Sequence, residues 1–164
     1  MAGYSHDVSS MLVKIDDVHY KFLRELEVCP VQAFREFAFA PPSLRRHVGL
    51  LGLLHKRVIG KCHPTFERLL PWLSDRFPDM LVRGHNKQLY GHWSDVTAHR
   101  ALFDRSIFAM CDIYNNLPQE VVNAKSVHEF QKRLMQIVHS RCQHGDPDWA
   151  SSFCRRDGPD TRLN

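Results

Sequence analysis

The sequence predicts a mainly α-helical fold: a small irregular domain of about five to seven helices with a loop-rich middle at about 74–100. Three observations predict it. Apolar residues recur every three or four positions over several long segments, which is the period of a helix. Prolines stand at the segment boundaries, where they stop one helix and start the next. The chain has 164 residues and 43% apolar content, which suits one core, whereas two independent domains would each be marginal.

The first expected helix begins at Ser10 and is amphipathic. Its apolar positions, spaced by three or four, are Met11, Ile15, Val18, Phe22 and Leu26. Charged residues occupy the opposite side. The helix stops at Cys29, because the residue before a proline is pushed out of the helical region. Pro30 then starts a short helix that ends at Phe37.

A long apolar helix is expected after the Pro41-Pro42 break, with Ser43 as its N-cap and Gly60 as its C-cap. Its apolar stripe consists of Leu44, Val48, Leu51, Leu54 and Val58, widened by Leu50 and Leu53. This stripe predicts the most buried helix of the domain. Gly49 and Gly52 each lower helix propensity by about 1 kcal/mol relative to Ala, so we expect them to allow a neighbouring helix to approach closely.

The following segments give weaker signals. Pro64 starts a helix that Pro71 limits. Residues 74–100 show no sustained period and are expected to form loops with one short hairpin. Residues 101–114 return to helical spacing, and Pro118 starts one more helical turn after the Asn115-Asn116 turn.

The last strong element is marked by Ser126 and Glu129, which have the spacing of a capping box. An apolar stripe follows, and Gly145 closes the helix. These elements predict a single helical domain over residues 10–145. Residues 1–9 are expected to be a disordered N-terminus and residues 146–164 a loosely ordered tail.

The composition and the N-terminal sequence indicate the cellular compartment in which we expect the chain. It has no apolar run of about 18 residues, and its N-terminus lacks the basic start and apolar core of a signal peptide. Its five cysteines are odd in number and scattered, which favours reduced thiols. We therefore expect no membrane partner and an intracellular location, in the nucleus or the cytoplasm.

Catalytic and metal motifs are not found in the sequence. Asp16 and Asp17 are adjacent on a helix, so their carboxylates point about 100° apart and cannot easily share an ion. Zinc sites usually contain paired cysteines two to four residues apart, and no such pair exists here. The sequence also lacks a nucleophile elbow, a Walker A loop and a dinucleotide fingerprint. We expect no catalytic residue, no metal ligand and no cofactor.

Basic residues concentrate in one segment of a chain whose net charge is only +4. Residues 42–68 contain six Lys or Arg and one acid. The candidate nucleic-acid-binding residues are Arg45, Arg46, Lys56, Arg57 and Lys61. Cations at the start of a helix are disfavoured by the helix dipole, which suggests an external anion such as phosphate. The alternative is a solvated helix face.

Several segments, taken in order, resemble a known family. The first group comprises Ile15–Val18, Phe22–Leu26, Phe39–Pro42, Leu44–Arg46 and Leu50–Lys56, and the second comprises Arg105–Phe108, Tyr114–Pro118 and Ser126–Gln131. Their order and spacing over residues 12–142 resemble the region that follows the polymerase palm in non-LTR (LINE-type) retrotransposon reverse transcriptases. Each motif alone is weak, and their shared order carries the resemblance.

The resemblance implies a thumb-like, C-terminal region that helps to hold template and primer. The family's catalytic aspartates, which bind magnesium in the intact enzyme, have no counterpart here. The implied function is a non-catalytic reverse-transcriptase fragment that contacts the backbone of RNA or an RNA·DNA hybrid, with the missing palm as a possible partner. Two alternatives stay open: a helical protein-interaction domain, and a degenerate fragment without a selected function.

Overall fold

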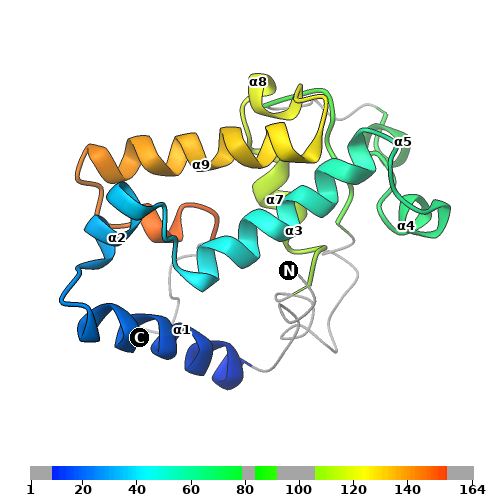
Figure 1. The fold of residues 1–164 in the computed structure, drawn as a ribbon. Helices are drawn as coiled ribbons and strands as arrows, with labels where there is room; N and C mark the ends of the chain where they lie inside the picture. Colours follow the sequence, from blue (N-terminus) through cyan, green and yellow to red (C-terminus); the bar gives the residue numbers. More distant parts are fainter. Residues whose placement is uncertain (1–8, 79–83, 92–105, 155–164) are drawn as a thin grey trace, which may run out of the picture.

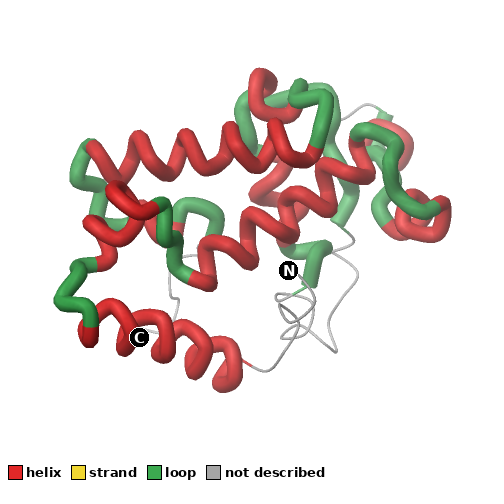
Figure 2. The backbone as a smooth tube through the Cα atoms, in the orientation of Figure 1, coloured by secondary structure: helices red, strands yellow, loops and turns green. Residues whose placement is uncertain are grey.

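The computed structural model describes residues 9–78, 84–91 and 106–154. Within these ranges the backbone forms helices joined by turns and loops, and no strand is present (Figure 2). One isolated antiparallel bridge joins Trp72 and Leu89, and much of the segment expected to hold a hairpin, 79–83 and 92–100, lies outside the described residues. The mainly α-helical fold is therefore confirmed.

Eight α-helices and one short 3-10 helix occur in the described ranges. They are α1 (Ser9–Glu25), α2 (Pro30–Phe37), α3 (Pro42–Val58), α4 (Pro64–Leu69), α5 (Leu73–Arg76), α7 (Met110–Asn115), α8 (Gln119–Val122), α9 (Val127–Gln143) and η1 (Trp149–Ser151). The single-turn helix α5 was not expected, because it falls in the segment without a sustained period. Residues 101–105 of the expected helix at 101–114 lie outside the described residues, as do 79–83 and 92–100 of the expected loop region.

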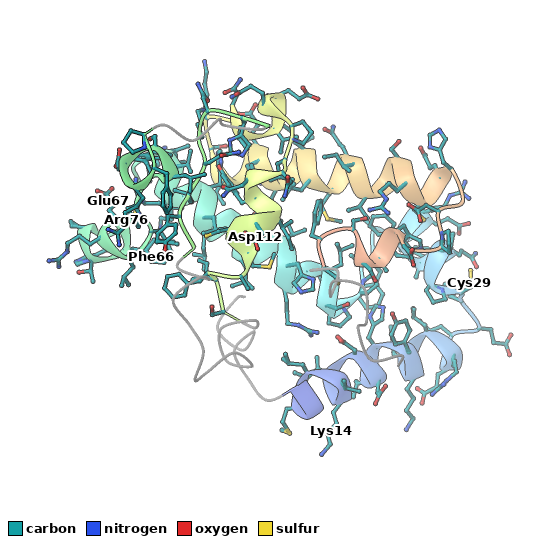
Figure 3. The ribbon with its side chains drawn as sticks, turned by 180° about the vertical axis from the view of Figure 1, so that it is seen from behind. Lys14, Cys29, Phe66, Glu67, Arg76 and Asp112 are labelled. Carbon is teal, nitrogen blue, oxygen red and sulfur yellow. The ribbon has the colours of Figure 1, made fainter. Side chains whose placement is uncertain are left out.

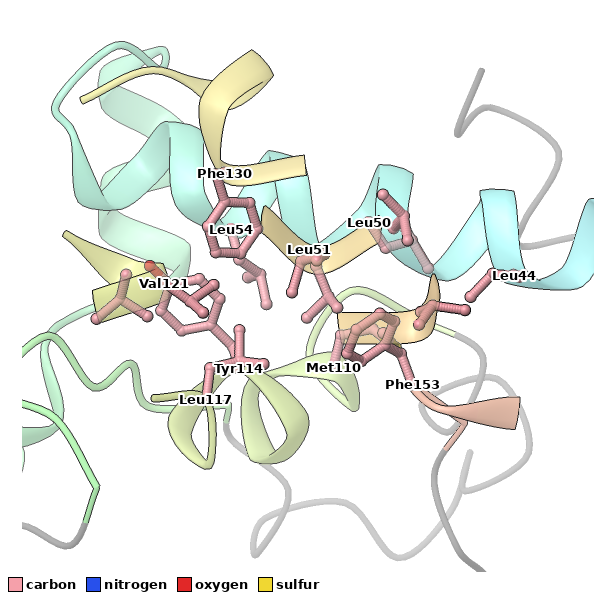
Figure 4. Packing of buried hydrophobic residues seen from close by; sticks show 14 of the residues in the cluster. Leu44, Leu50, Leu51, Leu54, Met110, Tyr114, Leu117, Val121, Phe130 and Phe153 are labelled. Atoms are coloured by element: carbon pink, nitrogen blue, oxygen red, sulfur yellow. The ribbon is translucent and has the colours of Figure 1, made fainter. Parts of the chain in front are cut away.

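Two of the three 17-residue helices, α3 and α9, form the centre of the fold and run side by side in opposite directions (Figure 1). The α7 helix packs against α3, and the core fills the space between these elements (Figure 4). Leu44, Leu51 and Leu54 of α3 are fully buried, as expected for the central helix. Gly52 confirms the expected close approach, because an added Cβ would lie 2.5 Å from Nε2 of Gln131 on α9.

A buried histidine joins α3, α7 and α9. The Nε2 atom of His55 lies 2.9 Å from the carbonyl oxygen of Ala124, and its Nδ1 atom lies 3.0 Å from the hydroxyl of Tyr114. Because a carbonyl only accepts, Nε2 carries the proton and Nδ1 accepts from the Tyr114 hydroxyl. The imidazole also stacks on Phe130, with 4.1 Å between ring centroids. His55 is thus a hydrogen-bonded core residue rather than an exposed ligand.

The helix caps agree only in part with the expectation. Ser126 Oγ accepts from the Glu129 N–H at 3.1 Å, but the Glu129 carboxylate accepts from the Lys125 N–H instead of completing the box on Ser126. Ser43 is not an N-cap: Pro41 occupies that position and α3 begins one residue before Ser43. A proline at the first helical position starts α3 without a side-chain cap, because its missing N–H needs no acceptor.

The α1 helix forms where expected, but its apolar stripe faces outward. Val18 is 68% exposed, and Met11 and Phe22 are each 47% exposed. The side that faces the body instead carries His19, which is buried, and Asp16. The inward side of α1 is therefore partly polar.

The expected domain boundary at residue 145 is wrong. Trp149 and Phe153 are buried in the core, and Trp149 stacks on Phe34 with 4.7 Å between ring centroids. The loosely ordered tail therefore does not begin at residue 146, and the core extends to the end of the described range at Cys154. Residues 1–8 and 155–164, which contain most of the expected disordered N-terminus and the end of the expected tail, lie outside the described residues.

Candidate nucleic-acid interface

A groove of about 660 Å³ lies between α3 and α9. Its floor is made of Val48, Gly49, Gly52 and Leu53 from α3 and Val127, Gln131 and Met135 from α9. Two exposed cations from α3, Arg45 and Lys56, line the groove together with Lys132 and His128 from α9. No acidic residue stands among its described lining residues. The groove is therefore an apolar channel with cationic side chains from both helices.

The helical period places Arg45 and Lys56 on the same side of α3. They are eleven residues apart, which is close to three full turns and separates their Cα atoms by about 16 Å. Gly49 and Gly52 fall between them on this side. Because glycine has no side chain, the floor between the two cations stays low.

The two walls of the groove are tied together at its floor. The Gln131 side chain reaches from α9 across Gly52, and its Nε2 atom donates to the Val48 carbonyl oxygen at 3.4 Å. Arg45 is also held in place, because its guanidinium carbon lies 5.6 Å from the centre of the Phe39 ring. The Gln131 contact therefore joins the two helices, and the Phe39 contact orients one of the cations.

Arg46 does not belong to this surface, which corrects the expectation. Its guanidinium forms a bidentate ion pair with the carboxylate of Asp16 on α1, with N···O distances of 2.8 and 3.0 Å. The Arg46 side chain is only 7% exposed. A buried guanidinium held by a carboxylate is not free to bind an external phosphate. Arg46 is therefore a structural residue that fastens α1 to α3.

Arg57 is also turned inward, against the expectation. Its Nε atom donates to the Leu70 carbonyl oxygen at 3.1 Å, and its guanidinium carbon lies 4.7 Å from the centre of the Trp72 ring. The side chain is buried. Arg57 joins the end of α3 to the segment between α4 and α5. The fifth expected residue, Lys61, is exposed but follows the end of α3 and does not line the groove.

The phase of the helix explains these two corrections. Arg46 lies four residues before Leu50 and eight before Leu54, so it shares their buried side. Arg57, three residues after Leu54, continues the same stripe. A helical wheel of α3 could have separated these two from Arg45 and Lys56. The contribution of Lys132 was missed because nothing in the sequence shows that α9 packs beside α3.

A thiol and an imidazole meet at the start of α3. The Cys154 Sγ atom lies 3.6 Å from Nδ1 of His47. Burial raises the pKa of the Cys154 thiol and lowers the pKa of the His47 imidazole. Both shifts favour the neutral forms, which does not favour an activated thiolate nucleophile at this position.

The described residues contain no cluster of potential metal ligands: groups of three or more His, Cys, Asp or Glu side chains that could hold a metal ion do not occur among them. Asp16 is paired with Arg46 while Asp17 is exposed, as expected for adjacent helical residues. Among the described helices, none has the length and apolar character needed to cross a membrane.

Some of the residues that carry the family resemblance lie in the core, whereas those on α1 are mostly exposed. The Asn115 side chain forms two hydrogen bonds with the backbone of Leu89, both 2.9 Å long. These bonds attach residues 84–91 to the end of α7. Tyr114 and Phe130, from two of the quoted segments, pack with His55 from a third. Comparison of the chain with protein-family models, with curated proteins and with solved structures finds no match.

Proposed function

We propose that this chain is a non-catalytic nucleic-acid-binding domain that corresponds to the C-terminal, post-palm region of a non-LTR reverse transcriptase. Its ligand is the sugar-phosphate backbone of RNA or of an RNA·DNA hybrid. The observation that carries the proposal is the α3–α9 groove, where Arg45, Lys56 and Lys132 gather without a nearby acid among the described lining residues. Cations that are exposed and free of carboxylates neutralise phosphates and release counterions, which is the main source of such affinity.

The packing of the motif residues gives separate support. The segment around His55 meets those around Tyr114 and Phe130, which lie more than 50 residues further along the chain, in one junction. If motifs that occur in a fixed order encode one fold, residues from different motifs are expected to pack against one another. The resemblance therefore concerns the scaffold, and the binding residues are argued from the groove alone.

The proposal includes the finer points that follow from the resemblance. The domain acts beside a polymerase palm, in the nucleus or the cytoplasm, and contributes no catalytic group or magnesium ligand. Binding is through the backbone, so it depends strongly on salt and weakly on base sequence. Arg46 and Arg57 are not part of the proposed interface, since both have internal partners.

The test compares two triple charge reversals. The groove variant carries Arg45→Glu, Lys56→Glu and Lys132→Glu. The matched control carries Arg24→Glu, Arg35→Glu and Arg68→Glu, which changes the net charge equally at exposed positions outside the groove. Binding of the full chain to a single-stranded RNA and to an RNA·DNA hybrid is measured by fluorescence anisotropy at several salt concentrations.

Loss of three phosphate contacts predicts that the slope of log K against log salt becomes shallower by about 2, at roughly 0.7 per contact on a single strand. The control is expected to keep most of the slope. An equal loss of RNA affinity in both variants would show that only the net charge of the chain matters. Unchanged RNA binding by the groove variant would show that the groove is not part of the interface. Circular dichroism checks that both variants stay helical.

A further inference from the structure

The outward side of α1 carries an apolar stripe that the rest of the described fold does not cover. Its members are Met11, Ile15, Val18 and Phe22, which are between 38% and 68% exposed. Lys14, beside this stripe, points away from the body of the domain (Figure 3). The intervals of four, three and four residues are those of a two-helix coiled-coil seam. A continuous exposed apolar stripe of this kind marks a surface that binds another protein, a membrane or a ligand.

The stripe is complementary to itself when a second copy is laid antiparallel. With the centre of the pair between Asp16 and Asp17, Ile15 of one copy faces Val18 of the other. In the same register, Met11 faces Phe22 of the second copy. All four apolar positions then have an apolar partner, and each pairing occurs twice because the arrangement is two-fold symmetric.

A small apolar pocket lies at the Phe22 end of the stripe. It has a volume of about 350 Å³ and is lined by Phe22, Leu26, Val28, Phe37 and Phe39, among others. The antiparallel register brings Met11 of the second copy to this end. An unbranched thioether side chain adapts to irregular gaps and contacts aromatic rings favourably. The apolar, partly aromatic lining of the pocket therefore suits the Met11 side chain of the second copy.

We propose that α1 is the surface through which two copies of this chain associate as an antiparallel dimer. The seam covers only about 16 Å of helix from Met11 to Phe22. An interface of this size is at the small end of the range for specific complexes, so we expect a dissociation constant in the micromolar range. The surface is separate from the α3–α9 groove, so the proposal does not depend on nucleic-acid binding.

Dimerisation and nucleic-acid binding are expected to respond to salt in opposite directions. Lys14 and Lys21 flank the seam, and in the antiparallel register Lys14 of one copy faces Lys21 of the other. Screening of this repulsion should strengthen the dimer as salt increases. Binding to a phosphate backbone should weaken under the same change.

Sedimentation equilibrium of the full chain, from about 1 to about 300 µM, measures the association. Val18→Glu places a charge in the seam and is expected to weaken the dimer at least about tenfold. Val13→Glu is the matched control: Val13 is 55% exposed on the same helix but lies at the position farthest from the seam. The control is expected to dimerise like the parent chain.

A mixing experiment tests the register. Ile15→Lys and Val18→Glu should each give a monomer, and an equimolar mixture should restore a dimer because the new lysine faces the new glutamate. A parallel pair would not bring these positions together, so monomeric mixtures would overturn the antiparallel arrangement. A parent chain that stays monomeric throughout would overturn the dimer, as would equal weakening by Val13→Glu. Monomers that bind lipid vesicles through Val18 would assign the stripe to a membrane surface instead.

Discussion

The ion pair between Asp16 and Arg46 makes the sharpest prediction about stability. Asp16→Asn keeps the shape of the side chain but removes the charge that faces the guanidinium. The pair has N···O distances of 2.8 and 3.0 Å, and its side chains are 7% exposed for Arg46 and 21% for Asp16. Removing one partner of a fully buried pair costs about 3–5 kcal/mol, because the other charge is left without compensation. Since Asp16 retains some contact with water, we expect a smaller loss of about 2–3 kcal/mol.

This loss should appear in two measurements. For a domain of this length, 2–3 kcal/mol corresponds to a decrease in Tm of roughly 4–12 °C. Among the described helices, α1 has its main contacts with α2 and α3, so it can also detach before the rest unfolds. Hydrogen exchange of its amides is then expected to accelerate by roughly 30- to 150-fold.

The neighbouring residue provides the control. Asp17→Asn makes the same change of charge on the same helix, but Asp17 is exposed. We expect its Tm to stay within about 1–2 °C of the parent chain, as for most surface substitutions. If Asp16→Asn behaved like Asp17→Asn, Arg46 would not depend on Asp16, and its exclusion from the nucleic-acid interface would lose its physical basis.

Three further predictions concern the core and the caps. Tyr114→Phe should lower the free energy of unfolding by about 1–2 kcal/mol, because Nδ1 of His55 loses its donor; an unchanged urea midpoint would contradict this bond. Ser126→Ala should cost about 1 kcal/mol by the same measurement, whereas Ser126→Asp should retain most of the stability, since Asp also caps a helix. Burial lowers the pKa of His55, His85 and His47 below the unfolded value of about 6.5. The unfolded chain therefore binds more protons as pH falls below that value, and the urea midpoint should decrease between about pH 7 and pH 5; a constant midpoint would contradict the shifts.

The helices could be predicted from the sequence because their signals are local. Prolines at the starts of α2, α3 and α4 and the Ser126 cap of α9 act within one turn. The apolar period then extends each helix, and Gly60 and Gly145 follow the ends of α3 and α9. The short α5 helix was missed for the same reason, since four residues are too few to show a period.

Which side of a helix faces the core could not be predicted in the same way for α1. Its most apolar stripe, which includes Val18 and Phe22, faces outward, whereas the side with Asp16 and His19 faces the body. Amphipathicity alone predicts burial of the apolar stripe. The observed orientation depends on Arg46, which lies 30 residues further along the chain and supplies the partner for Asp16. Such a contact becomes visible only when the two helices are placed together.

The corrected set of cations changes the expected strength of binding. Five phosphate contacts, as the basic segment first indicated, would give a salt slope of about −3.5 on a single strand, whereas the three exposed groove cations give about −2. The groove floor is apolar, and its described lining contains no aromatic side chain other than the imidazole of His128 on which a base could stack. We therefore expect the cations to supply most of the affinity. A measured slope near −2 would agree with the groove as the structure builds it. A slope near −3.5 would require cations from outside it, because Arg46 and Arg57 are held by internal partners.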